Sequence, residues 1–211
     1  MDPEKQERKQ YDKEFKINAL KLSMEAGRST DQLPRFLTRD EFSTIISLVD
    51  GVKLINIFKF AALTGGRRGE ILNLQWKDVD FMNELITIQS SKYYRVKHGK
   101  SRIIPLPKPV MPILKSIEPS DLFVFDIEGK WETKEDFVTK GFKKFSQAAG
   151  LDEEVKFHTL RATAASWWAQ AGAAALQIKE LLGHTYVKTT EQYTRIPATE
   201  LRNVVDALSP F

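Results

Sequence analysis

Two arginines stand where a bound anion would need them. An arginine guanidinium can donate to two phosphate oxygens at once, and it stays charged at any working pH. Arg67 follows a glycine turn at an expected helix N-terminus, where backbone N–H groups also favour anions, and Glu70 lies one turn on to hold it. Arg161 lies three residues after His158, so the two side chains project together from a helix. Taken singly, either pair could instead be a set of charged residues on the solvated surface of a helix.

A tyrosine and a histidine near the C-terminus form a second candidate group. The stretch KELLGHTYVKTTEQYTRIP contains His184 and, soon after it, Tyr193. Residues 181–183 are typical of a helix that ends on glycine, which tolerates the left-handed conformation of many helix ends. Thr189 and Gln192 have capping-box spacing, so a new helix is expected to carry Tyr193 in or beside its first turn. Tyr193 and His184 could therefore share one small volume; the alternative is a half-buried aromatic ring beside a solvated histidine.

The helices that would position these residues follow from apolar periodicity and turn signals. The pattern predicts helices over residues 4–31, 38–49, 53–63 and 67–74, and helical texture from residue 135 onward. Thr38 and Glu41 have capping-box spacing at the start of the second of these helices. Because the strongly charged texture of the first helix ends near Leu33, we expect a charged N-terminal helical extension over residues 1–32 and one domain over residues 33–211.

Between the helices the periodicity changes to that of strands. Residues 85–88 follow an Asn-Glu turn and predict a strand. Residues 93–96 and 102–104 flank His98-Gly99, so we expect them to pair as the two arms of a hairpin. The fold class predicted is α+β, mostly α-helical, with a small antiparallel β-sheet.

Composition narrows the classes of function. The chain has 211 residues, 42% of them hydrophobic, which suits a globular protein with one sizeable core. Its 32 Lys+Arg and 28 Asp+Glu give a formal charge of +4, which is compatible with a polyanionic partner if the cations cluster. With no cysteine and three histidines, we expect neither a metal site nor disulfides. No apolar run approaches the ~20 residues of a membrane span and no secretory leader is evident, so we expect a cytoplasmic protein with no membrane partner.

Taken together, the motifs resemble the tyrosine recombinases, the phage integrase family. The matching segments, in chain order, are Thr64-Gly65-Gly66-Arg67-Arg68-Gly69-Glu70, Leu74-Gln75-Trp76-Lys77-Asp78, His158-x-x-Arg161, Leu182-Gly183-His184 and Tyr193. The resemblance runs from about Leu33 to Phe211 and implies the catalytic-domain fold of that family. It also implies a site of Arg67, Lys97, His158, Arg161, His184 and Tyr193, with Glu70 in support.

The lysine of this site is placed by one segment. The family carries its lysine in a β-hairpin turn, and residues 97–106, KHGKSRIIPL, resemble that turn. Lys97 fits the family spacing best, and Lys100 is the alternative.

These side chains suit the cleavage and rejoining of DNA strands. The resemblance makes Tyr193 the nucleophile, and two arginines can meet the charge that grows on the non-bridging phosphate oxygens without a metal or cofactor. Because the unperturbed pKa of tyrosine is near 10, a base should assist, and His158 is the candidate. The hairpin lysine would protonate the departing 5′ oxygen, while His184 would hold the phosphate. A covalent 3′-phosphotyrosine stores the phosphodiester energy, so rejoining needs no ATP.

The partners implied are double-stranded DNA and further copies of the chain. Cations expected to contact DNA are Arg68, Lys92, Arg95, Lys100 and Arg102. The resemblance implies assembly of a dimer or tetramer on DNA. Residues 198–208 form an amphipathic stripe that would pack either on its own domain or on a neighbouring subunit.

Some features depart from the family. Ala162 stands where the family commonly has a histidine, and Gly66 replaces an often bulkier residue. The ~32 residues before the domain are too few for the separate helical DNA-binding domain that usually precedes it. Instead, residues 9–29 resemble the opening of an insertion-sequence transposase helix-turn-helix, although a solvated charged helix fits equally.

Two functions compete with DNA recombination and integration by a mobile-element recombinase. One is a non-catalytic DNA-binding protein, either a recombinase relic or a regulator. The other is strand relaxation of the type IB topoisomerase kind. A relic has no reason to keep its catalytic side chains, and the short stretch from Leu182-Gly183-His184 to Tyr193 favours a recombinase.

Overall fold

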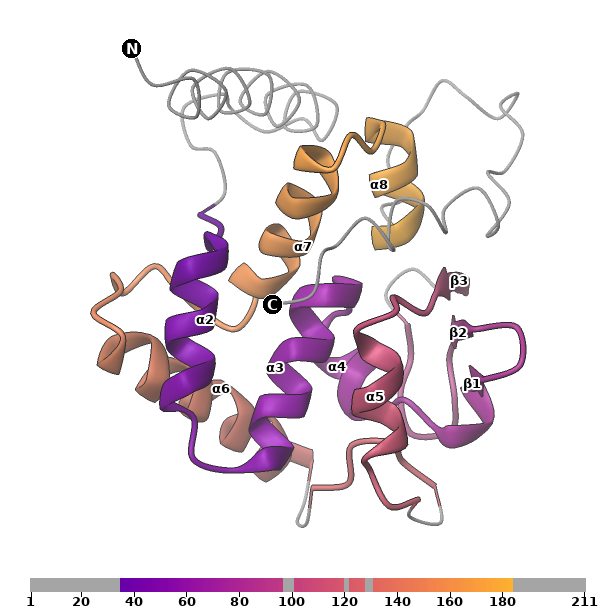
Figure 1. Ribbon diagram of the computed structural model, residues 1–211. Helices are drawn as coiled ribbons and strands as arrows, with labels where there is room; N and C mark the ends of the chain where they lie inside the picture. The colour runs from indigo at the N-terminus through magenta and orange to yellow at the C-terminus, as the bar shows by residue number, and fades with distance from the viewer. Residues whose placement is uncertain (1–34, 97–100, 120–121, 128–130, 184–211) are drawn as a thin grey trace.

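The computed structural model describes residues 35–96, 101–119, 122–127 and 131–183 (Figure 1). Several expectations lie outside these residues: the helix over 4–31, the lysine turn with Lys97 and Lys100, and the segment with His184, Tyr193 and residues 198–208.

The described part of the chain is mostly helical. Its helices are α2 (Arg39–Leu48), α3 (Val52–Thr64), α4 (Arg68–Leu72), α5 (Val110–Lys115), α6 (Trp131–Ala148), α7 (Thr159–Gln170) and α8 (Ala175–Leu182), with the 3-10 turn η1 (Trp76–Asp78). Strands β1 (Val79–Asp80), β2 (Leu85–Ile88) and β3 (Arg102–Pro105) form an antiparallel sheet in chain order. Figure 1 shows this sheet at one side of the helices, next to α4 and α5. The predicted α+β, mostly helical class is confirmed.

Helix α2 begins where its local sequence predicts. The Thr38 hydroxyl accepts a hydrogen bond from the Glu41 N–H at 3.1 Å, and the Glu41 carboxylate accepts one from the Thr38 N–H at 2.8 Å. This reciprocal pair satisfies two N–H groups that a helix start otherwise leaves open, and it confirms the predicted capping box.

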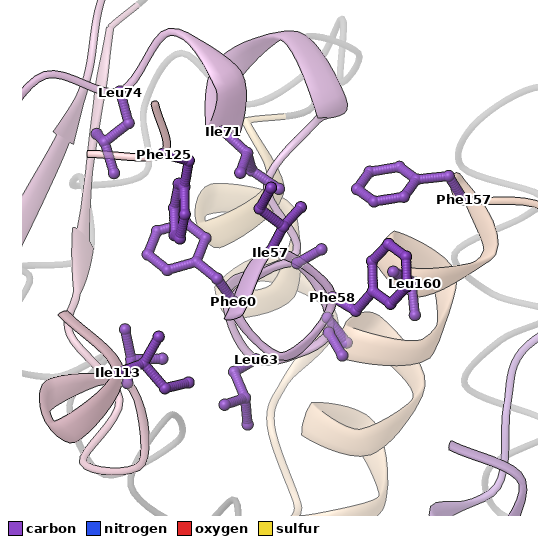
Figure 2. Packing of buried hydrophobic residues seen from close by; sticks show 14 of the residues in the cluster. Ile57, Phe58, Phe60, Leu63, Ile71, Leu74, Ile113, Phe125, Phe157 and Leu160 are labelled. Atoms are coloured by element: carbon purple, nitrogen blue, oxygen red, sulfur yellow. The ribbon is translucent and has the colours of Figure 1, made fainter. Parts of the chain in front are cut away.

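Helix α3 lies at the centre of the core. It is apolar on nearly every side, because α5, α6 and α7 all pack against it. In Figure 2 the Phe60 ring meets Phe125, and Phe58 lies beneath Phe157. The Phe58 and Phe142 rings also meet edge to face, with centroids 5.1 Å apart. A truncation such as Phe58→Ala in this core costs about 3–5 kcal/mol.

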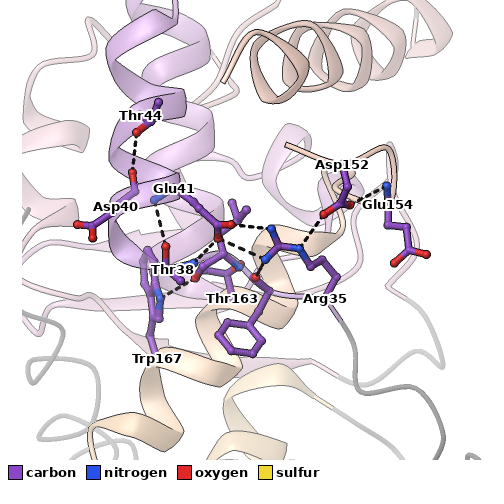
Figure 3. A network of polar contacts seen from close by, with 11 residues as sticks. Arg35, Thr38, Asp40, Glu41, Thr44, Asp152, Glu154, Thr163 and Trp167 are labelled. Carbon is purple, nitrogen blue, oxygen red and sulfur yellow. Dashed lines mark hydrogen bonds and ion pairs between the residues drawn. The ribbon is translucent and has the colours of Figure 1, made fainter. Parts of the chain in front are cut away.

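The N-terminal end of the described chain is fastened across α7. The Leu37 N–H donates to the Thr163 hydroxyl at 2.9 Å, and the Trp167 indole N–H donates to the Leu37 carbonyl at 3.1 Å. Arg35 forms ion pairs with Glu41 of α2 and with Asp152 in the loop before α7 (Figure 3). Residues 35–38 are therefore part of the domain rather than a free linker.

The predicted pairing of residues 93–96 with 102–104 is wrong. Strand β3 pairs with β2 instead, with Ile86 opposite Ile104. Residues 93–96 form no strand, because two serine hydroxyls take the backbone N–H groups that a ladder would use. The Ser91 hydroxyl accepts from the N–H groups of Tyr93 and Tyr94, each at 3.2 Å, and the Ser90 hydroxyl accepts from that of Val96 at 3.1 Å.

Candidate active site

The turn after α3 brings three helices together at one point. Gly65 ends α3 in the left-handed conformation, with φ 62°. A Cβ at Gly65 would lie 2.8 Å from Leu182 of α8 and 3.1 Å from Trp168 of α7. Only glycine allows this approach, because it accepts positive φ and has no side chain to collide.

Arg67 lies at the start of α4, as predicted, and is held by Glu70. The Arg67 backbone N–H donates to one carboxylate oxygen of Glu70 at 2.8 Å, and the Arg67 Nη1 donates to the other at 2.8 Å. The Glu70 side chain is fully buried, whereas that of Arg67 is 21% exposed. The remaining two guanidinium nitrogens of Arg67 make no hydrogen bond to any residue that the structure describes.

Arg102 reaches the same carboxylate from strand β3. Its two terminal nitrogens donate to the two oxygens of Glu70 at 2.9 and 2.7 Å, and its Nε donates to the Leu181 carbonyl at 3.0 Å. The Arg102 side chain is 8% exposed. The geometry thus gives Arg102 a place inside the site instead of the surface DNA contact expected from the sequence.

Arg161 completes the cluster from the first turns of α7. It is buried, and its guanidinium donates to the Gly65 carbonyl at 2.6 Å and to the Leu182 carbonyl at 2.5 Å. Arg102 and Arg161 therefore bind the last two carbonyls of α8, where the helix dipole favours cations. Helix α8 ends on Gly183 in the left-handed conformation, as predicted, and His184 is the next residue.

The cluster carries more positive charge than it neutralises. Burial alone would raise the pKa of Glu70, but Arg102 and Arg67 lower it to about 2. Burial, together with repulsion from Arg67 and Arg102, lowers the pKa of Arg161 to about 9, so its guanidinium still stays charged at neutral pH. Arg67 and Arg102 thus share one carboxylate, while Arg161 lies close enough to be repelled by both. An anion would relieve the repulsion among the three guanidinium groups.

Of the other predicted catalytic residues, His158 is the one that the structure describes. His158 is exposed and immediately precedes α7, and its carbonyl accepts from the Arg161 N–H at 3.1 Å, so the two lie one turn apart. Lys97, His184 and Tyr193 are outside the described residues, as is the alternative Lys100. Within the described part, no group of three or more His, Asp or Glu could hold a metal ion.

The remaining cations predicted to contact DNA have distinct surroundings. Arg68 is tied to α6 by an ion pair with Glu135 at 2.8 Å. Lys92 lies over the Tyr93 ring, with its Nζ 4.7 Å from the ring centroid. Lys92 and Arg95 are both exposed. Among the described residues that were predicted to contact DNA, Lys92 and Arg95 are therefore the ones accessible to a partner.

The sequence reasoning missed the bond between Arg102 and Glu70. A usable signal existed, since residues two apart in a strand share a face and Ile104 is an obvious core residue. Tyr94 was also missed: a Cβ at Gly69 would lie 2.6 Å from its ring. Burial and the nearby Glu70 raise the pKa of Tyr94, so its hydroxyl remains protonated beside the cluster.

The chain is similar to known proteins of one family. Residues 35–200 match the phage integrase family. The chain belongs to that family. A tyrosine recombinase of Thermosipho africanus is 30% identical over 186 residues, covering 84% of this chain and 62% of the relative. Tyrosine recombinase XerA of Pyrococcus furiosus is 29% identical over 204 residues, covering 91% of this chain and 69% of the relative. The chain thus spans about three fifths of the Thermosipho relative's length.

Solved structures of an integrase and of a recombinase share the fold. The integrase from mycobacterium phage Brujita superposes with a TM-score of 0.68 at 18% identity, over 86% of this chain and 60% of that one. A XerA recombinase superposes with a TM-score of 0.59 at 24% identity, over 81% of this chain and 64% of that one. The expected family and catalytic-domain fold are confirmed. None of the described helices is long and apolar enough to cross a membrane.

Proposed function

We propose that this chain is the catalytic domain of a tyrosine recombinase, which cleaves and rejoins double-stranded DNA through a covalent 3′-phosphotyrosine at Tyr193. The observation that carries the proposal is a cluster of three arginines. Arg67 and Arg102 bond the carboxylate of Glu70, and Arg161 bonds the carbonyl of Gly65 beside them. The surplus positive charge of this cluster suits a phosphodiester, which gains negative charge on its non-bridging oxygens as the phenol attacks.

Each proposed catalytic side chain has one task. Arg67 and Arg161 would donate to the non-bridging oxygens, and His158 would take the proton of the tyrosine. Lys97, or Lys100 in its place, would protonate the departing 5′ oxygen. His184 would donate to the phosphate from the position after Gly183. The two arginines reach the transition state from different elements, α4 and α7, so the phosphate would bridge them.

The proposed partners are DNA and further copies of the chain. Among the structural neighbours are a lambda integrase dimer bound to a COC′ core site and XerH bound to difH substrate. By analogy, we propose that this chain assembles as a dimer or tetramer on DNA. We also propose the cytoplasm as its location and recombination, rather than relaxation, as its outcome. Assembly supplies the partner strand whose 5′ hydroxyl would attack the phosphotyrosine.

Covalent capture tests the proposal without knowledge of the target site. The protein is incubated with a pool of nicked duplexes of randomised sequence, and adducts are separated by denaturing electrophoresis and sequenced. A nick just downstream of the cleaved phosphate lets the short fragment that carries the new 5′ hydroxyl diffuse away, so rejoining fails and the adduct accumulates. We expect adducts enriched in one sequence. Tyr193→Phe is the matched control: it should bind the selected duplex and form no adduct. Adducts that persist in Tyr193→Phe, or no adduct with the unaltered chain, would overturn the proposal.

A further inference from the structure

Arg102 joins three parts of the candidate site, and nothing in the proposed chemistry assigns it a role. Its guanidinium donates to both oxygens of Glu70 and to the Leu181 carbonyl at the end of α8. Its own strand, β3, follows directly on the predicted lysine turn. One side chain therefore connects α4, the exit of α8 and the strand beside the turn.

The exit of α8 is fitted to this side chain. Gly183 adopts φ 65°, and a Cβ there would lie 2.8 Å from Cδ of Arg102 and 3.2 Å from its Nε. The backbone thus passes directly against the Arg102 side chain just before His184. The position of Arg102 consequently limits how the chain can leave α8.

Glu70 is shared unequally between its two arginine partners. Arg102 takes both carboxylate oxygens at 2.9 and 2.7 Å, whereas the guanidinium of Arg67 takes one oxygen at 2.8 Å. A carboxylate prefers a bidentate arginine when one is available. Without Arg102, Glu70 would draw Arg67 into that bidentate pairing, and Arg67 would lose the donors that face a phosphate.

We propose that Arg102 is a positioning residue, which occupies Glu70 so that the Arg67 guanidinium stays available to an anion and which fixes the exit of α8. This inference rests on the proposed function for the identity of the anion as a DNA phosphate. The competition for Glu70 itself is a property of the charges and distances in the protein.

A double-substitution series tests the competition. The variants are Arg102→Met, which keeps an unbranched apolar stem and loses the charge, Glu70→Gln, and the two combined. Cleavage at saturating nicked DNA should fall at least about tenfold in Arg102→Met, as after loss of a transition-state donor, while DNA affinity changes far less. The combined variant should cleave faster than Arg102→Met, because a neutral glutamine does not sequester Arg67. A packing role alone predicts the opposite, with the combined variant equal to or worse than Arg102→Met.

A second measurement keeps the inference testable apart from cleavage. Sulfate should raise the melting temperature of the unaltered protein by binding at the arginines. This shift should shrink in Arg102→Met and recover in the combined variant. If Arg102→Met does not fold, Arg102→Lys replaces it, since lysine keeps the charge but cannot bond Glu70 through two nitrogens. Should adducts fail to form, the proposed function falls, whereas the sulfate series still decides the role of Arg102. An unchanged sulfate shift in Arg102→Met, or no recovery in the combined variant, overturns the inference.

Discussion

Replacing Gly65 by alanine should damage both the stability and the proposed chemistry of the domain. The new methyl group would lie 2.8 Å from Leu182 Cδ2, 3.1 Å from Trp168 and 3.3 Å from the Cβ of Ala164. All three neighbours are buried, so they cannot move aside freely. The change also requires alanine to hold φ 62°.

The magnitude combines two effects. Left-handed backbone costs a residue with a Cβ about 1–2 kcal/mol. Overpacking a closed core adds about 1–3 kcal/mol. We therefore expect Gly65→Ala to lower the free energy of unfolding by roughly 2–5 kcal/mol. The shift of the Gly65 carbonyl, which accepts from Arg161, should slow DNA cleavage in whatever fraction stays folded.

Urea unfolding followed by circular dichroism measures the loss. Gly150→Ala is the matched control, because Gly150 has a similar φ of 74° and a methyl group there would meet nothing within 4 Å. The control should therefore lose only the backbone contribution of about 1–2 kcal/mol. The difference between the two variants isolates the packing against Leu182 and Trp168. Equal losses at the two glycines would refute the close approach of α3, α7 and α8.

Further predictions concern charge. Arg67→Ala or Arg161→Ala should slow cleavage by about 10²-fold or more with little change in DNA affinity. Single-turnover adduct formation measures the cleavage rate, and a near-normal rate would show that the arginine does not stabilise the reacting phosphate. Because the folded pKa of Glu70 is about 2, below its unfolded value, its stabilisation is present above the unfolded pKa and is lost as pH falls toward 2. Acid titrations of stability should therefore be flatter in Glu70→Gln, and an unchanged acid limb would contradict the ion pair. Replacing Lys92 and Arg95 by alanine should reduce the slope of log affinity for DNA against log salt by roughly 0.9 for each lost phosphate contact, and an unchanged slope would place both cations away from the backbone.

Local signals in the sequence predicted the elements well. Thr38 and Glu41 satisfy each other's N–H groups within one turn, so no distant residue is needed to recognise the start of α2. Gly183 is likewise a local signal for the end of α8. The strand expected over 93–96 is absent for an equally local reason, because the serine hydroxyls before it accept the backbone N–H groups that a strand would use.

The assembly of the site depends on distant pairings that no local pattern encodes. Arg67 and Glu70 are three apart, and their contact was predicted from helix spacing. Arg102 meets the same carboxylate across 32 residues of chain, and Arg161 reaches the Gly65 carbonyl across 96. The family resemblance named Arg67 and Arg161, but their shared surroundings follow only from the packing of α3, α7 and α8.

The shared carboxylate of Glu70 also constrains how this protein can evolve. A neutral residue at 70 would leave Arg102 buried without its counter-charge, and a neutral residue at 102 would leave Glu70 to Arg67 alone. Either single change is therefore expected to destabilise the domain. We therefore expect positions 70 and 102 to be substituted together or not at all during evolution. The buried ion pair would thus couple substitutions in two segments that are far apart in the sequence.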